Sequence, residues 1–422
     1  MVIAACGGGS NDSTPTPSPS PSATPSPAPT PSPTPSPSAG PDFDSDLAMA
    51  HVEALAVDIG IRAAGREGED DAAQYISDEL ASYGYETELQ PFPVLLLEGV
   101  DIDFTLLEPE GQDFVVGTLD RAAEGDAEAP IIVVPGLGEP GDFPSTVDGA
   151  IALIERGVLP FAEKVQNAQE AGAVAVIIYN NEPGPIEGTL VYPSEIPVIT
   201  MSQEDGERLV NLSSQRDLRG RVAIEYLLVD GESQNVIGRM PGATCRIVVG
   251  GHHDSVPAGP GANDNGSGTA VVLEMARVLA QQGETEDVCF VLFGAEEIGL
   301  VGSRYYVDNL SSGEFDALEA MLDFDMLGVG AGWPLAGSQS IVDLADEVAT
   351  ELGIEIQASA LPEGVGSDHA PFQNAGIPAI IFNCFCDDNY HTAADRFEFV
   401  EPQRLLEAGR IGLGMVEELT GA

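Results

Sequence analysis

The sequence predicts an α/β protein with a doubly wound, mostly parallel β-sheet and an inserted segment that is itself a β-rich α/β unit. The first observation is the alternation of apolar runs with helical patterns after Asn235. Residues 245–250 and 288–293 are apolar at almost every position, which is typical of parallel strands buried on both faces. The second is a change in the sequence pattern between residues 108 and 226, where short apolar runs are separated by Gly- and Pro-rich turns. With 422 residues, of which 43% are hydrophobic, the chain is long enough for more than one domain.

The first 41 residues differ in composition from the rest of the chain. Small and apolar residues precede Cys6 and resemble the end of a bacterial lipoprotein signal, so residues 1–6 are expected to be a signal remnant with a lipidated cysteine. Residues 7–41 alternate Pro with Ser, Thr and Ala, a composition that predicts an extended tether. Together these features predict an exported protein, anchored by lipid at the cell surface or in the periplasm.

The first folded segment, residues 42–107, is predicted to contain two helices followed by two strands. Apolar residues at helical spacing cover residues 47–59, and a second helical pattern covers residues 70–83. Strand-like patterns follow at residues 86–92 and 102–107. The loop between the helices, residues 60–66, has no chemistry that its residue types reveal.

The predicted insert, residues 108–226, contains no His or Cys and no cluster of metal-binding side chains. One helix is expected at residues 160–171. The expected strands are residues 131–134, 150–154, 173–179, 198–201 and 221–225.

The second folded segment, residues 227–422, places potential metal ligands just after its strands. Strands are expected at 245–250, 288–293, 321–324 and 378–382, and helices at 268–281, 340–352 and 402–418. The candidate ligands are His252, Asp264, Glu297, Asp325 and His391. Because the carboxyl ends of parallel strands meet at one edge of a sheet, we expect these side chains to converge.

This set of side chains suits a pair of zinc ions. Two metals close together need one shared carboxylate and a few ligands each, and two His with three carboxylates supply that set, with Asp264 as the bridge. Asp254 could accept the proton of the other ring nitrogen of His252 and fix its tautomer. In the Glu296-Glu297 pair, one carboxylate can bind the metal, and its neighbour is left free to move a proton from metal-bound water to a leaving amine.

The motifs around these residues resemble the co-catalytic di-zinc aminopeptidases, a family with bacterial leucyl-type aminopeptidases and with glutamate carboxypeptidase and transferrin-receptor relatives. The motifs are H-x-D-S, G-A-N-D-N-G-S-G, F-G-A-E-E, F-D-M, S-D-H-A-P-F and Y-H-T. The resemblance implies a zinc exopeptidase that removes N-terminal residues from peptides or proteins. It implies two Zn²⁺ on the five ligands above, Glu296 as general base and Tyr390 as a hydrogen-bond donor to the tetrahedral intermediate. Asp323 is an alternative to Asp325, although F-D-M fits Asp325 better.

The insert is similar to a protease-associated domain. The segments that carry the similarity are A-L-I-E-R-G, F-A-E-K-V-Q-N-A-Q-E-A-G-A-V-A-V-I-I-Y-N-N and I-P-V-I-T-M. In such families the domain is a noncatalytic lid or substrate-access module, so the resemblance implies that role here.

Three other functions stay open at this point. A carboxypeptidase of the same fold would need Arg at the pocket, and Arg304 and Arg396 are the candidates in a chain poor in bases. A glutaminyl cyclase would use one zinc, which the complete ligand set disfavours, and a noncatalytic receptor would have lost ligands. No G-x-S-x-G elbow marks a serine hydrolase. The other histidines, His51, His253 and His369, are expected to have packing, loop or structural roles.

Charge and cysteine content bear on the partners and the compartment. Asp and Glu outnumber Lys and Arg by 69 to 16, for a net charge of −53, and such a field repels nucleic acid. It suits a salty or extracellular medium, or serves solubility alone. No apolar run reaches the ~18 residues of a membrane span. The oligomeric state is not indicated.

A disulfide is expected between Cys245 and Cys289, with reduced core thiols as the alternative. Cys245 lies as far before His252 as Cys289 lies before Glu296. If the two strands are parallel neighbours that end at one site, the sulfurs are level. Cys384 and Cys386 could form a short bridge beside the site.

Overall fold

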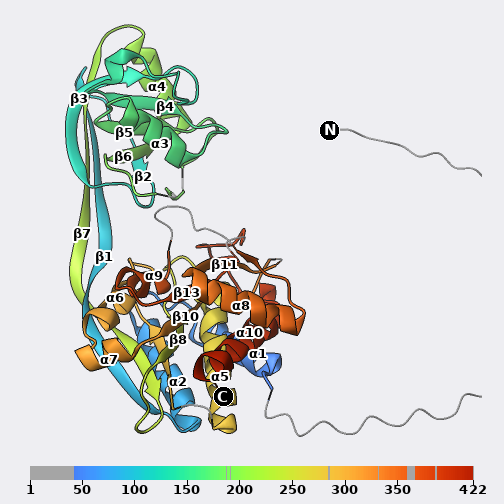
Figure 1. The fold of residues 1–422 in the computed structure, drawn as a ribbon. Helices are drawn as coiled ribbons and strands as arrows, with labels where there is room; N and C mark the ends of the chain where they lie inside the picture. The colour runs from blue at the N-terminus through green and yellow to red at the C-terminus, as the bar shows by residue number, and fades with distance from the viewer. Residues whose placement is uncertain are drawn as a thin grey trace, which may run out of the picture. The chain divides into compact units, whose positions relative to one another are not determined.

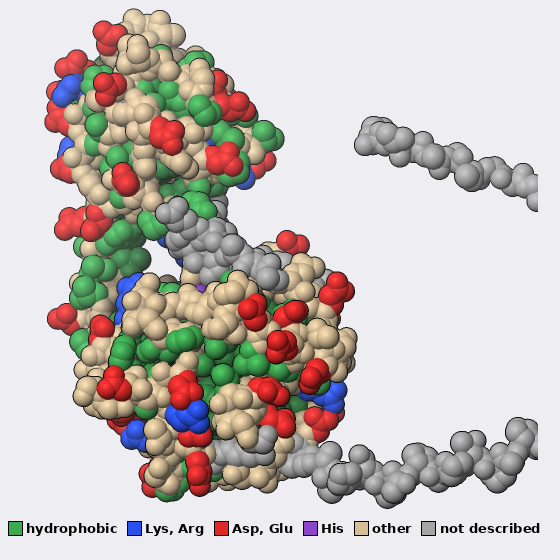
Figure 2. Space-filling view, in the orientation of Figure 1, with side chains coloured by type: hydrophobic (Ala, Val, Ile, Leu, Met, Phe, Trp, Pro, Cys, Tyr) green, Lys and Arg blue, Asp and Glu red, His purple; other side chains and the backbone are tan. Residues whose placement is uncertain are grey.

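The computed structural model describes residues 42–186, 188–190, 192–283, 286–330, 332–358, 366–384 and 387–421 (Figure 1). The predicted signal remnant and tether lie outside the described residues, and so does Cys386. None of the described helices is both long enough and apolar enough to cross a membrane. Acidic side chains are spread over the visible face, where basic side chains are few (Figure 2).

The segment before the insert forms two helical stretches and one long strand. These elements are α1 (Ser45–Glu53), the π-helical turn η1 (Ala54–Ile59), α2 (Glu67–Ser82) and β1 (Glu86–Glu108). Asp44 caps α1 by accepting hydrogen bonds from the backbone N–H groups of Asp46 and Leu47. The predicted helices are confirmed, with α2 beginning three residues earlier than its apolar pattern.

The segment after the insert alternates strands with helices, as predicted. Its elements are β8 (Ile247–His252), η3 (Ala262–Ser267), α5 (Gly268–Gln282), β9 (Val288–Phe293), α6 (Val301–Asp308), α7 (Ser312–Ala317), β10 (Ala320–Phe324), β11 (Pro334–Gly337), α8 (Gln339–Leu352), β12 (Gln357–Ala358), α9 (His369–Asn374), β13 (Ala379–Phe382), η4 (Phe397–Phe399) and α10 (Pro402–Thr420). Strands β13, β10, β8 and β9 are parallel neighbours in that order, and all their residues are buried.

Two separate apolar cores cover the two faces of this parallel sheet. Phe290 and Leu292 of β9 belong to a core shared with α1, α2, α5, α8 and α10. Val291 and Phe293, the alternate residues of the same strand, belong to a second core that includes Tyr306 of α6 and Phe372 of α9. Because side chains alternate between the faces of a strand, helices must cover both faces, and the doubly wound architecture is confirmed.

The insert has an apolar core of its own, and its strands continue the same hydrogen-bonded sheet through β7. Its elements are β2 (Val116–Thr118), β3 (Gly125–Val133), η2 (Ser145–Val147), β4 (Ile151–Glu155), α3 (Phe161–Glu170), β5 (Ala175–Tyr179), β6 (Val198–Met201), α4 (Gln203–Ser213) and the first part of β7 (Leu218–Arg239). Strands β3, β4, β5 and β6 are parallel neighbours, and their apolar residues form a cluster distinct from those of the other segments. Helix α4 was not predicted, although Ser202 caps it by accepting from the backbone N–H of Asp205.

Strands β1 and β7 pair antiparallel along most of their length and join the insert to the parallel sheet (Figure 1). The prediction of two short strands at 86–92 and 102–107 is wrong, because β1 is one strand of 23 residues. Likewise β7 is a strand of 22 residues, where only 221–225 was expected. β1 contains Pro91 and Pro93 within its length, and because it pairs only with β7, prolines are tolerated on its free edge.

Cys245 and Cys289 form the predicted disulfide, with their Cα atoms 5.2 Å apart. The prediction assumed that the two residues are level in the sheet, and this assumption is wrong. Val248, not Cys245, is the partner of Cys289 in the β8–β9 register. The chain instead turns before β8, where the N–H of Thr244 donates to the carbonyl of Glu286. This turn lays Cys245 beside Cys289.

The second cysteine pair is untested. Cys386 lies outside the described residues, so a bridge between Cys384 and Cys386 stays a prediction.

Candidate active site

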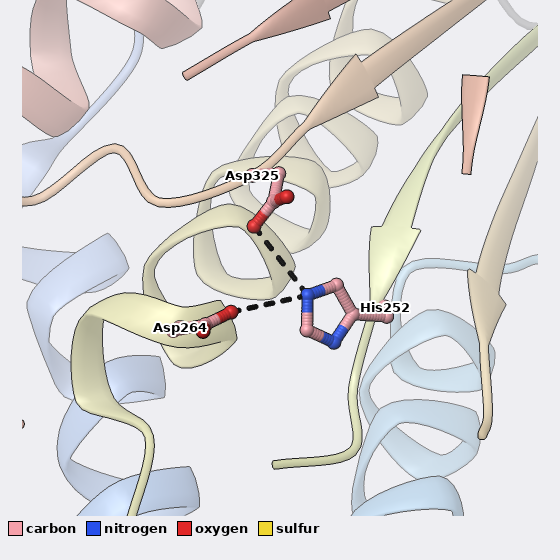
Figure 3. A group of neighbouring side chains, drawn as sticks. All are labelled: His252, Asp264 and Asp325. Atoms are coloured by element: carbon pink, nitrogen blue, oxygen red, sulfur yellow. Dashed lines mark ion pairs between the residues drawn. The ribbon is translucent and has the colours of Figure 1, made fainter. Parts of the chain in front are cut away.

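Strand ends of the parallel sheet bring the predicted ligands together. His252 is the last residue of β8, and Asp325 directly follows β10. Glu297 lies in the loop after β9, and His391 lies in the loop after β13. Asp264 comes from η3, the irregular turn that leads into α5 (Figure 3).

The five side chains form two groups that share Asp264. In the first group, Nε2 of His252 lies 3.3 Å from Oδ1 of Asp264 and 3.4 Å from Oδ1 of Asp325 (Figure 3). In the second, Nε2 of His391 lies 3.3 Å from Oδ2 of Asp264 and 2.9 Å from Oε2 of Glu297. Each oxygen of Asp264 therefore faces a different group, which is the arrangement of a bridging carboxylate.

The chemistry of these side chains fits two zinc ions. Imidazole and carboxylate ligands are common at zinc sites. Oδ2 of Asp264, Oε1 of Glu297 and Oδ1 of Asp325 are buried without a hydrogen-bond partner among the described residues. A buried carboxylate is stable only when hydrogen bonds or cations compensate its charge, so cations bound between these oxygens would stabilise them.

The pKa values in the two groups reflect a concentration of negative charge. Burial, followed by the carboxylate of Asp264, raises the pKa of Glu297 to about 7. Burial alone would lower the pKa of His391, but the adjacent carboxylates of Asp264 and Glu297 outweigh it and raise that pKa to about 9. In the same way carboxylates around His252 outweigh its burial and raise its pKa well above the usual range. Metal ions would take the place of the protons that these groups now favour.

Asp254 supports both the ligand His252 and the loop that carries Glu296. Its Oδ1 lies 3.5 Å from Nδ1 of His252, as the sequence predicted, and its backbone carbonyl lies 3.2 Å from the same nitrogen. Its carboxylate also accepts hydrogen bonds from the backbone N–H groups of Glu296, at 3.0 Å, and Glu297, at 3.2 Å. This second role was not predicted.

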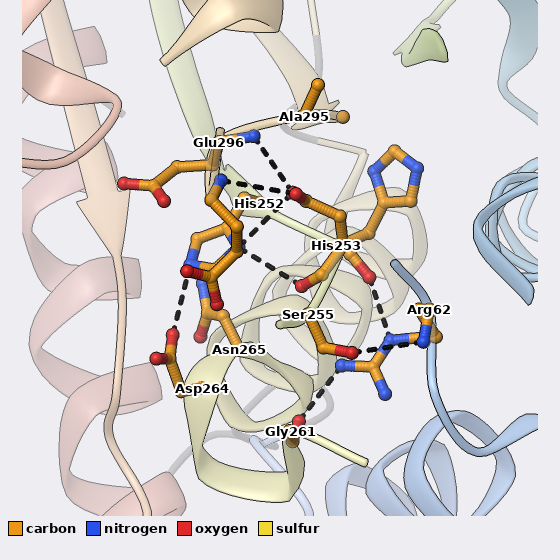
Figure 4. A network of polar contacts seen from close by, with 12 residues as sticks. Arg62, His252, His253, Ser255, Gly261, Asp264, Asn265, Ala295 and Glu296 are labelled. Carbon is orange, nitrogen blue, oxygen red and sulfur yellow. Dashed lines mark hydrogen bonds and ion pairs between the residues drawn. The ribbon is translucent and has the colours of Figure 1, made fainter. Parts of the chain in front are cut away.

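Arg62 and Asp395 hold the Asp264 turn, and the sequence did not identify either of them. Asp395 accepts hydrogen bonds from the backbone N–H groups of Asn263, at 2.8 Å, and Asp264, at 2.9 Å. Arg62 is fully buried in the loop 60–66, and its guanidinium donates to five backbone carbonyls, including those of His253 and Gly261 (Figure 4). Burial lowers the pKa of Arg62 to about 10. A lone Arg in a loop gives no signal in a sequence, because its partners are main-chain atoms far along the chain.

Glu296 and Tyr390 line a pocket of about 370 Å³ together with all five ligands. Burial, followed by the carboxylates of Asp368 and Glu297, raises the pKa of Glu296 well above its usual range. Tyr390 is 46% exposed, and its ring stacks on that of His391 with centroids 3.7 Å apart.

The bases that a carboxypeptidase would need are not where the sequence suggested. Arg304 and Arg396 are both exposed, and neither is among the described residues that line the pocket. The one Lys or Arg in that described lining is Arg121, which the insert contributes together with Thr189.

The remaining candidates have other roles. Asp323 accepts from the backbone N–H of His369 at 2.9 Å and lies 3.3 Å from its Nδ1, so Asp325, not Asp323, faces His252. His253 is buried, and burial lowers its pKa to about 4. His51 is a packing residue, with its Nδ1 2.6 Å from the hydroxyl of Tyr75. As expected, none of these three histidines belongs to either ligand group.

Comparisons with known proteins agree with this geometry. A family model described as peptidase family M28 matches residues 235–416, and one described as a PA domain matches residues 121–209. Aminopeptidase YwaD of Bacillus subtilis is 35% identical over 400 residues, which cover 88% of this chain and 84% of YwaD. Leucine aminopeptidase 2 of Trichophyton equinum is 31% identical over 338 residues, or 75% of this chain and 67% of its own length.

Solved structures give the same result. BSAP, a zinc aminopeptidase from Bacillus subtilis, matches with a TM-score of 0.66 at 32% identity, over 89% of this chain and 95% of its own. An aminopeptidase from Aneurinibacillus sp. strain AM-1 matches with a TM-score of 0.65 at 30% identity, over 89% of this chain and 94% of its own. The chain therefore belongs to peptidase family M28 and is a zinc-dependent aminopeptidase with an inserted PA domain.

Proposed function

We propose that this aminopeptidase hydrolyses the first peptide bond of peptides and proteins with Glu296 as its general base. The observation that carries the proposal is the pair of ligand groups sharing one carboxylate, in a pocket whose wall also holds Glu296. The proposed zinc ligands are His252, Asp264, Glu297, Asp325 and His391.

Each residue has a task in the proposed reaction. When bound, the two zinc ions would supply Lewis acidity, polarising the scissile carbonyl and making the attacking water more acidic. Glu296 accepts the proton of that water and then donates it to the departing amine. Tyr390 donates a hydrogen bond to the oxygen that becomes negative in the transition state.

The small number of bases in the pocket supports cleavage at the N-terminus. Three of the five Asp or Glu residues in its described lining are proposed zinc ligands, whose negative charge the two ions would offset. A carboxypeptidase needs bases that hold the C-terminal carboxylate, and the described lining contains one, Arg121. The lining therefore favours aminopeptidase over carboxypeptidase action.

A comparison of two adjacent glutamates tests the general base. Glu296→Gln keeps every proposed zinc ligand but cannot accept a proton, so the purified variant is expected to hold two zinc ions per chain and to lose nearly all turnover of aminoacyl chromogenic substrates. Glu297→Gln, the matched control, removes a ligand and is expected to lose zinc as well as turnover. Substantial turnover by the Glu296→Gln variant, or cleavage of N-acetylated substrates by the native enzyme, would overturn the proposal.

We also propose that the protein is exported and is held at the membrane through a lipid on Cys6. The Val-Ile-Ala-Ala-Cys sequence and the Pro-rich residues after it support this proposal. The Cys245–Cys289 disulfide is in keeping with an oxidising compartment.

Mass spectrometry of the N-terminal peptide tests the anchor. In cells that naturally make the protein, the enzyme is expected in the membrane fraction, with a diacylglycerol thioether on Cys6. An unmodified Cys6, or enzyme found in the cytoplasm alone, would refute the anchor without touching the catalytic proposal.

A further inference from the structure

In the loop that carries the general base, three consecutive backbone N–H groups donate hydrogen bonds to two buried carboxylates. Ala295 donates to Oε1 of Glu69 at 3.0 Å, while Glu296 and Glu297 donate to the two oxygens of Asp254. Ala295 is fully buried with a φ of 53°, in the left-handed region that non-glycine residues rarely adopt. The surroundings must therefore hold this backbone in place.

Glu69 lies in the first turn of α2 and is fully buried. Its Oε1 accepts a second hydrogen bond from Oγ of Ser233 at 2.7 Å, and its Oε2 accepts one from the backbone N–H of Gly65 at 2.6 Å. The N-terminus of a helix favours a negative side chain at this position. Ser233 and Gly65 thus fix the carboxylate, whose third hydrogen bond comes from the catalytic loop.

Strand β7 contacts the same loop directly. Oδ1 of Asn235 accepts from the backbone N–H of Gly294 at 3.2 Å. A Cβ on Gly294 would lie 2.5 Å from Oγ of Ser233 and 2.8 Å from Oε1 of Glu69. The loop therefore packs so closely against these two side chains that a methyl group would not fit between them. Further along, β7 pairs with β3 of the insert, between residues 218 and 224.

We propose that Glu69 is a positioning residue for Glu296, and that through Ser233 it fixes the general-base loop to the strand that also carries the insert. Glu69 is not among the described residues that line the pocket, so it acts through the backbone of Ala295. The inference rests on the proposed role of Glu296. A proton acceptor misplaced by about 1 Å can lose up to roughly a hundredfold in rate, so the support of this loop is a matter of catalysis as well as stability.

Two substitutions at Glu69 separate these effects. Glu69→Ala removes every bond to the loop and is expected to lower kcat roughly tenfold or more, with KM changed less than about twofold and two zinc ions retained. Glu69→Gln is expected to stay within about threefold of the native kcat. Its amide oxygen still accepts from Ala295 and Ser233, and only the bond from Gly65 is lost.

Asp70→Ala serves as a control, and Ser233→Ala is the alternative test if Glu69→Ala does not fold. Asp70 accepts a hydrogen bond from Gln234 at 3.0 Å and so also joins α2 to β7, but on the exposed side. Asp70→Ala is therefore expected to leave kcat unchanged. If Glu69→Ala does not fold, Ser233→Ala removes one donor and is expected to lower kcat by roughly two- to threefold.

Hydrogen exchange of the peptide covering residues 294–297 supplies the readout beyond activity. In Glu69→Ala, and to a smaller degree in Ser233→Ala, these amides are expected to exchange faster, while the melting temperature of Asp70→Ala and its exchange stay native. Native kcat per zinc-loaded molecule in Glu69→Ala, or native exchange of this peptide, would overturn the inference. Turnover by Glu296→Gln would instead overturn the proposed function, whatever the exchange result.

Discussion

The disulfide between Cys245 and Cys289 is expected to contribute substantially to the stability of the part of the chain that carries the metal site. The bridge joins residues 44 apart in the sequence. Confining a loop of that length in the unfolded chain stabilises the folded state by about 4 kcal/mol on the chain-entropy treatment. That is a large share of the ~5–15 kcal/mol by which folded proteins are usually stable. His252 and Asp264 both lie within the closed loop.

The chain has a built-in probe for this measurement. Trp333 is its one tryptophan, and it is buried in the peptidase core against Arg404, whose guanidinium lies 4.2 Å from the ring centroid. Urea unfolding followed by its fluorescence therefore reports on the peptidase core and not on the core of the insert. The proteins to compare are the oxidised native enzyme and the Cys245→Ala/Cys289→Ala variant, both with saturating zinc.

A loss of about 4 kcal/mol in the double variant is the expected result. Native enzyme unfolded in reductant should match the variant to within about 1 kcal/mol, because both lack the same constraint. Adding reductant to the variant reports any contribution from other bridges. A variant that lost less than about 1 kcal/mol would refute the reasoning, since the unfolded loop would then already be confined by residual structure.

Three further predictions follow from the buried polar groups. Chelation is expected to abolish turnover and lower the melting temperature, with zinc restoring both, whereas Asp264→Asn should fail to hold either ion tightly because both groups share that carboxylate. Native zinc content in that variant would contradict a bridging role. Arg62→Met leaves buried backbone carbonyls without a donor and is expected to lower the free energy of unfolding in urea by at least about 3 kcal/mol. A loss below about 1 kcal/mol would count against this network. Burial lowers the pKa of His51, so its contribution to stability is present above about 6.5 and is lost as the pH falls through its lowered folded value. Unfolding titrations from pH 7 to pH 5 should therefore show a shallower decline for His51→Gln than for the native chain, and equal slopes would refute the assignment.

Local patterns in the sequence were sufficient for the framework of the site. Residues 288–293 match β9 from end to end because a strand buried on both faces needs an apolar side chain at every position. His252, Glu297 and Asp325 followed because they stand at or soon after the ends of such strands, and parallel strands end at one edge of their sheet. Asp264 and His391 lie further along the loops that leave the same edge. The alternation of strands and helices gave the doubly wound class for the same reason.

Contacts between distant segments decided the rest. Ala295 and Glu69 are 226 residues apart, and the role of Glu69 depends on the packing of α2 beside β7, which brings it to the loop after β9. The F-D-M motif already favoured Asp325 over Asp323, and the tertiary structure adds the reason, because Asp323 accepts from the backbone N–H of His369. The length of β1 depended on its place at an edge, where Pro91 is tolerated.

Thus the sequence by itself determined which residue types meet at the metal site and on what kind of sheet. Only the tertiary structure decided which residues support them: Asp254 and Glu69 behind the general-base loop, and Arg62 and Asp395 behind the Asp264 turn. The physical reason is range. The periodicity of a strand or a helix can be recognised from a few neighbouring residues. The role of a buried carboxylate or guanidinium depends instead on the backbone atoms that folding brings to it from elsewhere in the chain.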